Sequence, residues 1–126
     1  MVQQRYNFGG KAANGRAPYF FNRSVVINLF SEFCKQRNIK LIFLTTPTYS
    51  TYRENLNANQ LKKTFETINE FVNTHSNCYY FNWFEDKTFV AEDFFDADHL
   101  SDIGAKKLSK KLSQQIDSLR FLKKDF

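Results

Sequence analysis

The sequence predicts an α/β domain with three layers, in which helices flank a parallel sheet. Segments whose apolar residues recur at helical spacing alternate along the chain with short apolar runs that are typical of strands. The expected order is helix, strand, helix, strand, loop, helix, and this alternation implies parallel strands joined by right-handed crossovers. The 126 residues, 42% of them apolar and 17% aromatic, are enough for one domain with a modest core.

The distribution of glycine and proline sets the domain boundaries. Residues 1–21 contain three of the four glycines and one of the two prolines, without a sustained period, so we expect an irregular N-terminal extension. The predicted domain covers residues 22–119, and residues 120–126 form a basic tail.

The first helix and the first strand follow the extension. A helix is expected over residues 22–37, with Asn38 as its stop, because five apolar residues fall on one side: Val25, Val26, Leu29, Phe30 and Phe33. The run Ile39–Leu44 is almost continuously apolar and ends at Pro47, which is typical of a strand buried on both faces.

A second helix and a second strand come after a polar loop. Helical spacing predicts a helix over residues 57–74, through Leu61, Phe65, Ile68 and Val72. His75 is expected to interact with the dipole at the end of that helix. The aromatic run Cys78–Trp83 predicts the second strand.

The last part of the domain is a long loop and a final helix. Residues 85–100 are acidic and aromatic, which is typical of a loop that lines a site. Ser101 is the expected N-cap of the helix. Its apolar stripe should contain Ile103, Leu108, Leu112, Ile116 and Leu119, and its lysines, Lys106, Lys107, Lys110 and Lys111, should form a solvated face.

Two strands are few for an independent parallel sheet. Either residues 1–21 add a strand or the domain belongs to a longer chain, and we favour the longer chain.

Charge and cysteine content exclude several classes of protein. The net charge of +5 is not interleaved with aromatic residues in a recognisable module, so no nucleic-acid partner is expected. Cys34 and Cys78 have no metal-type or redox spacing and are expected to be buried thiols. We expect neither a membrane span nor a signal peptide from the residues given, and the compartment is left unknown.

The clearest candidate for chemistry is the pair Asp96 and His99. A carboxylate three residues before a histidine can bind the ring Nδ1–H in a turn and leave Nε2 free to accept a proton. In an open α/β sheet, ligands bind at the carboxyl ends of the strands, where this loop should share a rim with the segment after the first strand. On that rim Thr46 and Tyr49 are candidate substrate-binding residues, although loop tyrosines also commonly pack over a core edge.

The block Asp96-Ala97-Asp98-His99-Leu100, followed by Gly104-Ala105 and an amphipathic helix, resembles the C-terminal block of SGNH (GDSL-type) hydrolases. The lead-in Glu92–Phe95 and the Thr45-Thr46-Pro47 segment resemble branches of that family that act on acylated polysaccharides or related cell-surface polymers. The resemblance covers about residues 22–119 and implies a partial SGNH/flavodoxin-like sheet.

This resemblance implies that His99 is a general base, that Asp96 orients it, and that the whole enzyme cleaves or transfers an ester-linked acyl group through an acyl-serine. The substrate would be an ester-bearing small molecule or polysaccharide. The Gly-Asp-Ser nucleophile block and the Gly and Asn oxyanion donors of the family are absent from this sequence. Ser50 is the only serine expected on the rim, and it lacks the tight turn of a nucleophile.

These features lead us to expect a fragment that needs a complementing N-terminal half or that self-associates. The competing hypothesis is a non-catalytic remnant that acts as a binding or assembly module. His99 could also be a loop histidine, with Asp96 merely capping a turn. Asp93, Asp96, Asp98 and His99 match no established cation-binding spacing, so we expect no metal and no cofactor. Asp98 is expected to face solvent or the final helix.

Overall fold

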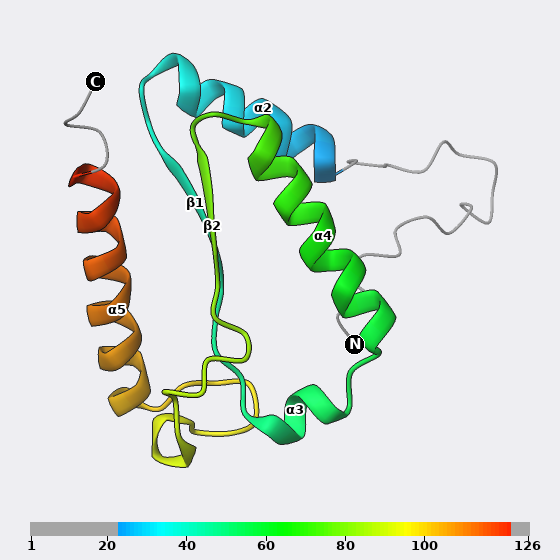
Figure 1. Cartoon of the computed structure of the whole chain (residues 1–126), viewed down its shortest axis with the longest axis vertical. Helices are drawn as coiled ribbons and strands as arrows, with labels where there is room; N and C mark the ends of the chain where they lie inside the picture. The colour runs from blue at the N-terminus through cyan, green and yellow to red at the C-terminus, as the bar shows by residue number, and fades with distance from the viewer. Residues whose placement is uncertain (1–22, 122–126) are drawn as a thin grey trace, which may run out of the picture. The chain divides into compact units, whose positions relative to one another are not determined.

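The computed structural model describes residues 23–121, so the predicted extension and residues 122–126 of the predicted tail lie outside the described residues. Helices and strands follow one another as Figure 1 shows. Their bounds are α2 Arg23–Gln36, β1 Leu41–Thr45, α3 Ser50–Glu54, α4 Ala58–Thr74, β2 Cys78–Asn82, the 3-10 helix η1 Ala91–Asp93 and α5 Asp102–Phe121.

The two strands form one sheet and run parallel, side by side (Figure 1). The Leu41 N–H donates to the Asn77 carbonyl at 2.8 Å, and the Trp83 N–H donates to the Thr45 carbonyl at 3.0 Å. Residue numbers therefore rise together along the pair, as in a parallel ladder. The predicted α/β class is confirmed as a small fold of two parallel strands flanked by helices.

The described chain divides into two compact units. Unit 1 comprises residues 23–44 and 57–81, and it contains α2, α4 and most of both strands. Cys34 and Cys78 are buried free thiols there, as predicted, with 3% and 7% of their surfaces exposed. The Cys78 sulfur lies 3.2 Å from the Ser31 hydroxyl, which is also buried, so α2 and β2 meet at a small polar core.

Local signals in the sequence explain where the helices of unit 1 begin and end. Asn38 adopts a left-handed φ of 56° after α2, and the Ile39 N–H reaches back to the Cys34 carbonyl at 2.8 Å, as in a Schellman motif. Asn57 caps α4 by accepting from the Gln60 N–H at 3.1 Å. His75 caps the other end, with Nδ1 2.7 Å from the Phe71 carbonyl, so the three predicted boundaries are confirmed.

Burial in unit 1 differs from the prediction. The apolar side of α2 is exposed, with Leu29 at 67% and Phe30 at 53%, whereas the packed side of the helix holds Ser31 and Cys34. All five residues of β1 are only half-buried, so the expectation of a strand buried on both faces was wrong. A sheet of two strands has too little neighbouring structure to enclose either strand.

Unit 2 comprises residues 45–56 and 82–121, and it contains α3, η1 and α5. Thr48 joins the segments that leave the two strands, because its N–H and its hydroxyl both donate to the Phe84 carbonyl, at 3.2 and 3.1 Å. Pro47, Phe84 and Phe89 are buried apolar residues of this unit. The five-residue α3 was predicted as loop, since a single polar turn has no periodicity to detect.

The N-cap of the final helix is the predicted one, but the apolar stripe along the helix differs from the prediction. Ser101 is its N-cap, accepting from the Gly104 N–H at 3.2 Å. Ile103 is 62% exposed and does not belong to the half-buried stripe of Leu108, Leu112, Ile116 and Leu119. Arg120 and Phe121 continue the helix instead of starting the predicted tail. None of the helices within residues 23–121 combines the length and the apolar composition needed to cross a membrane.

Candidate functional site

Residues 94–101 connect η1 to α5 within unit 2, and residues 94–100 of this segment form a closed loop. Phe94 and Leu100 form an isolated antiparallel bridge at its ends. The Phe95 N–H also donates to the His99 carbonyl at 2.9 Å, so a second backbone contact joins the two arms of the loop. This closure brings Asp96 and His99 to the same side of a tight turn.

Asp96 and His99 contact each other as the sequence predicts. The His99 Nδ1 lies 2.8 Å from Asp96 Oδ1 and 3.0 Å from Oδ2. A carboxylate at this distance accepts the Nδ1–H, so the neutral ring carries its lone pair on Nε2.

The same carboxylate also caps the turn. Asp96 Oδ1 accepts the His99 N–H at 2.8 Å and the Asp98 N–H at 3.2 Å. Asp96 therefore fixes the backbone under the ring as well as the ring itself. The structural role that the sequence left open for Asp96 is real, and it coexists with the contact to the imidazole.

The charges at this site favour a proton on the ring and none on the carboxylate. The hydrogen bond that the ring of His99 donates to Asp96 raises the pKa of His99 above its ordinary value, and the negative charges of Asp96 and Asp98 act in the same direction. The hydrogen bond from His99 lowers the pKa of Asp96, with the Asp98 and His99 N–H groups contributing. A histidine of raised pKa is a stronger base at Nε2.

Asp98 approaches the ring of His99, which was not predicted. Its side chain is exposed, as expected, but its Oδ1 also lies 3.1 Å from His99 Nδ1. The turn is tight enough for residues on both sides of Ala97 to approach one nitrogen. Asp96, Asp98 and His99 also offer ligand atoms within 4.8 Å of one another, but all three are exposed, and such acidic clusters are common without an ion, so we assign no metal to them.

The far side of the ring is open. The His99 side chain is 69% exposed. Within the described part of the chain, no serine hydroxyl hydrogen-bonds to His99, and Ser50, the serine predicted on the rim, is instead the first residue of α3.

The two candidate substrate-binding residues have different surroundings. The Tyr49 N–H donates to the Ala97 carbonyl at 3.0 Å, and the Tyr49 ring packs on Phe94 with centroids 5.6 Å apart. These two rings line a shallow pocket of about 300 Å³ together with Thr51, Ala91, Asp96 and Ala97. Thr46 is exposed and is not among the lining residues.

A family model described as "Protein of unknown function (DUF1574)" matches residues 20–114, which is well over half of the chain. The chain belongs to the DUF1574 family. Comparison with curated proteins gave no match, and comparison with solved structures gave none. The family description names no activity.

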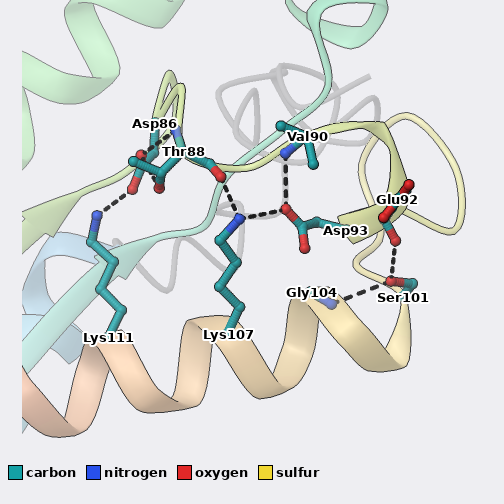
Figure 2. A network of polar contacts seen from close by, with 9 residues as sticks. All are labelled: Asp86, Thr88, Val90, Glu92, Asp93, Ser101, Gly104, Lys107 and Lys111. Carbon is teal, nitrogen blue, oxygen red and sulfur yellow. Dashed lines mark hydrogen bonds and ion pairs between the residues drawn. The ribbon is translucent and has the colours of Figure 1, made fainter.

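Sequence reasoning missed the polar network beneath the loop (Figure 2). Lys107 Nζ lies 2.8 Å from the Asp93 carboxylate, which is buried, and Lys111 pairs with Asp86. Two of the four lysines assigned to a solvated face of α5 are therefore ion-paired. Their i, i+4 spacing was visible in the sequence, but the acidic partners lie 14 and 25 residues away, and only the fold brings them together.

Proposed function

We propose that this DUF1574 chain carries the acid-histidine half of an SGNH-like ester hydrolase or acyltransferase. The observation that supports the proposal is the 2.8 Å contact between Asp96 and His99 Nδ1, with the ring otherwise exposed. Because Asp96 engages Nδ1, Nε2 is the nitrogen left to accept a proton. The nucleophilic serine would come from a complementing N-terminal part that this sequence does not contain.

In each round of the expected reaction, Nε2 of His99 accepts a proton and then returns it. The serine hydroxyl gives its proton to Nε2 while its oxygen attacks the ester carbonyl, and Asp96 stabilises the imidazolium that forms. The imidazolium then returns the proton to the departing alkoxide, which leaves an acyl-serine. Water or an acceptor hydroxyl releases the acyl group by the same two proton transfers in a second round.

The pocket beside Asp96 supports an ester-bearing substrate with a ring. Tyr49 and Phe94 present aromatic surface next to the polar Thr51 and Asp96, a mixture that suits the apolar faces and the hydroxyl groups of a sugar. An O-acylated carbohydrate or cell-surface polymer is the proposed substrate class. Thr46 remains a second candidate contact on the exposed segment after β1.

The exposed side of α2 supports a protein partner. Five apolar residues that would normally be covered lie on it, each at least 43% exposed: Val25, Val26, Leu29, Phe30 and Phe33. The complementing N-terminal half is the proposed occupant, and a second copy of the chain is the alternative. No nucleic-acid partner is proposed.

A different function is favoured by one observation. Because no serine hydroxyl within residues 23–121 bonds to His99, the chain could serve as a non-catalytic binding or assembly module that uses the same exposed apolar side. Under that hypothesis Asp96 caps its turn and has no chemical role.

An alcohol supplied in solution can stand in for the missing serine. The chain is mixed with p-nitrophenyl acetate and N-acetylserinamide, and O-acetylated N-acetylserinamide is quantified by mass spectrometry. We expect acyl transfer above the background rate, several-fold faster than with the His99→Ala variant, because a placed general base contributes up to about 10²–10⁴-fold. The His75→Ala variant is the matched control and should retain the rate. Equal rates for wild type and His99→Ala would reject the proposed function.

A further inference from the structure

The two ends of the loop that carries Asp96 and His99 are joined through the flanking residues Asp93 and Ser101. Asp93 is the last residue of η1 and directly precedes the loop, and Ser101 directly follows it. The Ser101 N–H donates to the Asp93 carbonyl at 2.9 Å, and the Ser101 hydroxyl donates to the Glu92 carbonyl at 2.8 Å. The orientation of the whole loop therefore depends on where Asp93 is fixed.

The side chain of Asp93 is fixed by α5. Asp93 is 3% exposed, and its Oδ2 accepts both the Lys107 ammonium at 2.8 Å and the Val90 N–H at 2.8 Å. Lys107 also donates to the Thr88 carbonyl and lies over the Phe89 ring, 4.9 Å from its centroid. Figure 2 shows Lys107 reaching from α5 to both acceptors, so one ammonium joins the helix to residues 88–93.

Gly104 brings the helix close enough for this contact. A Cβ atom at residue 104 would lie 1.9 Å from the Asp93 carbonyl oxygen, a distance that no side chain can occupy. The first turn of α5 consequently rests against the backbone of Asp93, one turn before Lys107 reaches its carboxylate. Backbone and side chain of Asp93 are thus held by the same helix.

We propose that the Asp93–Lys107 ion pair, which Gly104 makes possible by letting α5 approach Asp93, positions the loop so that Asp96 stays in contact with His99. Within residues 23–121, the imidazole of His99 contacts the carboxylates of Asp96 and Asp98, whereas Asp93 and Lys107 contact each other, so Asp93 and Lys107 act through the loop and are positioning residues, not catalytic ones. The role of this positioning in catalysis rests on the proposed function, but the positioning itself does not.

The direction of the change in the pKa of His99 separates positioning from simple electrostatics. Removal of the Lys107 charge by itself raises the pKa of a nearby histidine, because a repelling cation is lost. Loss of the Asp96 contact lowers the pKa, since that hydrogen bond is the largest cause of its elevation. A Lys107 variant that lowers the pKa of His99 therefore reports displacement of the loop.

The experiment is an NMR titration of His99 in the full chain. Lys107→Met should lower the pKa of His99, and Lys107→Arg should restore most of the wild-type value. Lys111→Met is the matched control, because it removes an ion-paired lysine one turn further along α5. We expect that variant to leave His99 unchanged or slightly raised.

A second variant keeps the test decisive if Lys107→Met fails to fold. The double variant Asp93→Asn with Lys107→Met leaves no unpaired buried charge and removes one charge of each sign, so its direct electrostatic effect nearly cancels. A lowered pKa of His99 in this variant supports the proposal, and an unchanged or raised pKa overturns it. Failure of the acyl-transfer experiment alongside a lowered pKa would reject the proposed function and leave the positioning intact.

Discussion

Asp96 serves the fold and the proposed chemistry with one carboxylate. Its Oδ1 accepts two backbone N–H groups of the turn and also approaches the ring of His99. The sequence predicted the acid-histidine contact from spacing alone, because three residues are enough for a turn to close. It did not predict that Asp98 would approach the same nitrogen, since neighbouring residues share a partner only when the turn is very tight.

Gly104 gives a prediction at the level of one atom. Gly104→Ala would normally stabilise a helix by up to about 1 kcal/mol through helix propensity. Here the new methyl group meets the Asp93 carbonyl oxygen, so we expect a net loss of about 2 kcal/mol or more. Urea unfolding measures the change. Ser113→Ala, an exposed position of α5, is the control and should change stability by less than about 0.5 kcal/mol. A Gly104→Ala variant as stable as the wild type would show that the helix is free to move away.

Helices and strands were predictable from the sequence where local signals are strong. Asn38, Asn57 and Ser101 mark ends or beginnings that the structure confirms through backbone geometry or cap hydrogen bonds. What failed was burial, because periodicity shows which side of an element is apolar but not whether anything covers it. The apolar side of α2 is exposed, and two lysines of α5 are paired. Ion pairs between residues far apart in sequence leave no local pattern.

The end of α2 provides a test of its capping motif. Asn38→Gly should leave stability unchanged or slightly raised, because glycine adopts a left-handed φ without strain. Asn38→Val should cost about 1–2 kcal/mol, since a β-branched residue is strained at a φ of 56°. Thermal and urea unfolding of both variants measure the difference. Equal stability of the two would contradict the αL assignment.

The exposed side of α2 predicts association of the isolated chain. Leu29 and Phe30 are more than half exposed, and burial of two such side chains contributes about 3 kcal/mol or more, enough for at least a tenfold change in affinity. The double variant Leu29→Gln with Phe30→Gln should therefore weaken self-association in sedimentation velocity. Phe95→Gln is the control, because Phe95 is 83% exposed in the other unit. A wild-type chain that stays monomeric at every concentration would count against this surface.

Within residues 23–121, the four groups whose pKa values are shifted all lie in unit 2: Asp86, Asp93, Asp96 and His99. Lys107 and the Val90 N–H lower the pKa of Asp93. Burial would raise the pKa of Asp86, but Lys111 and Thr88 outweigh it and lower the value. These carboxylates stabilise the fold above their ordinary titration range, and the stabilisation is lost as the pH falls through their folded pKa values. The pKa of His99 is shifted in the opposite direction, upward. His99 therefore stabilises the fold at pH values below its ordinary titration range, and this stabilisation is lost as the pH rises through its raised pKa.

Stability should therefore decrease on both sides of a mildly acidic optimum. Trp83, the single tryptophan, lies in unit 2 near Lys111 and reports unfolding of that unit by fluorescence. Urea midpoints measured from pH 3 to pH 8 should decrease most steeply below about pH 4, where the carboxylates become protonated. Asp93→Asn should flatten that acidic decrease. An acidic decrease that is identical in this variant would exclude Asp93 from the pH dependence.

The most direct test of the acid-histidine pair is the pKa of His99 measured by NMR in the wild type and in Asp96→Asn. We predict a wild-type value above the ordinary histidine value of 6.5, a clear fall in Asp96→Asn, and a smaller fall in the matched Asp98→Asn variant. A His99 that titrates at its ordinary value and is unaffected by Asp96→Asn would contradict the pair, and with it the proposed function.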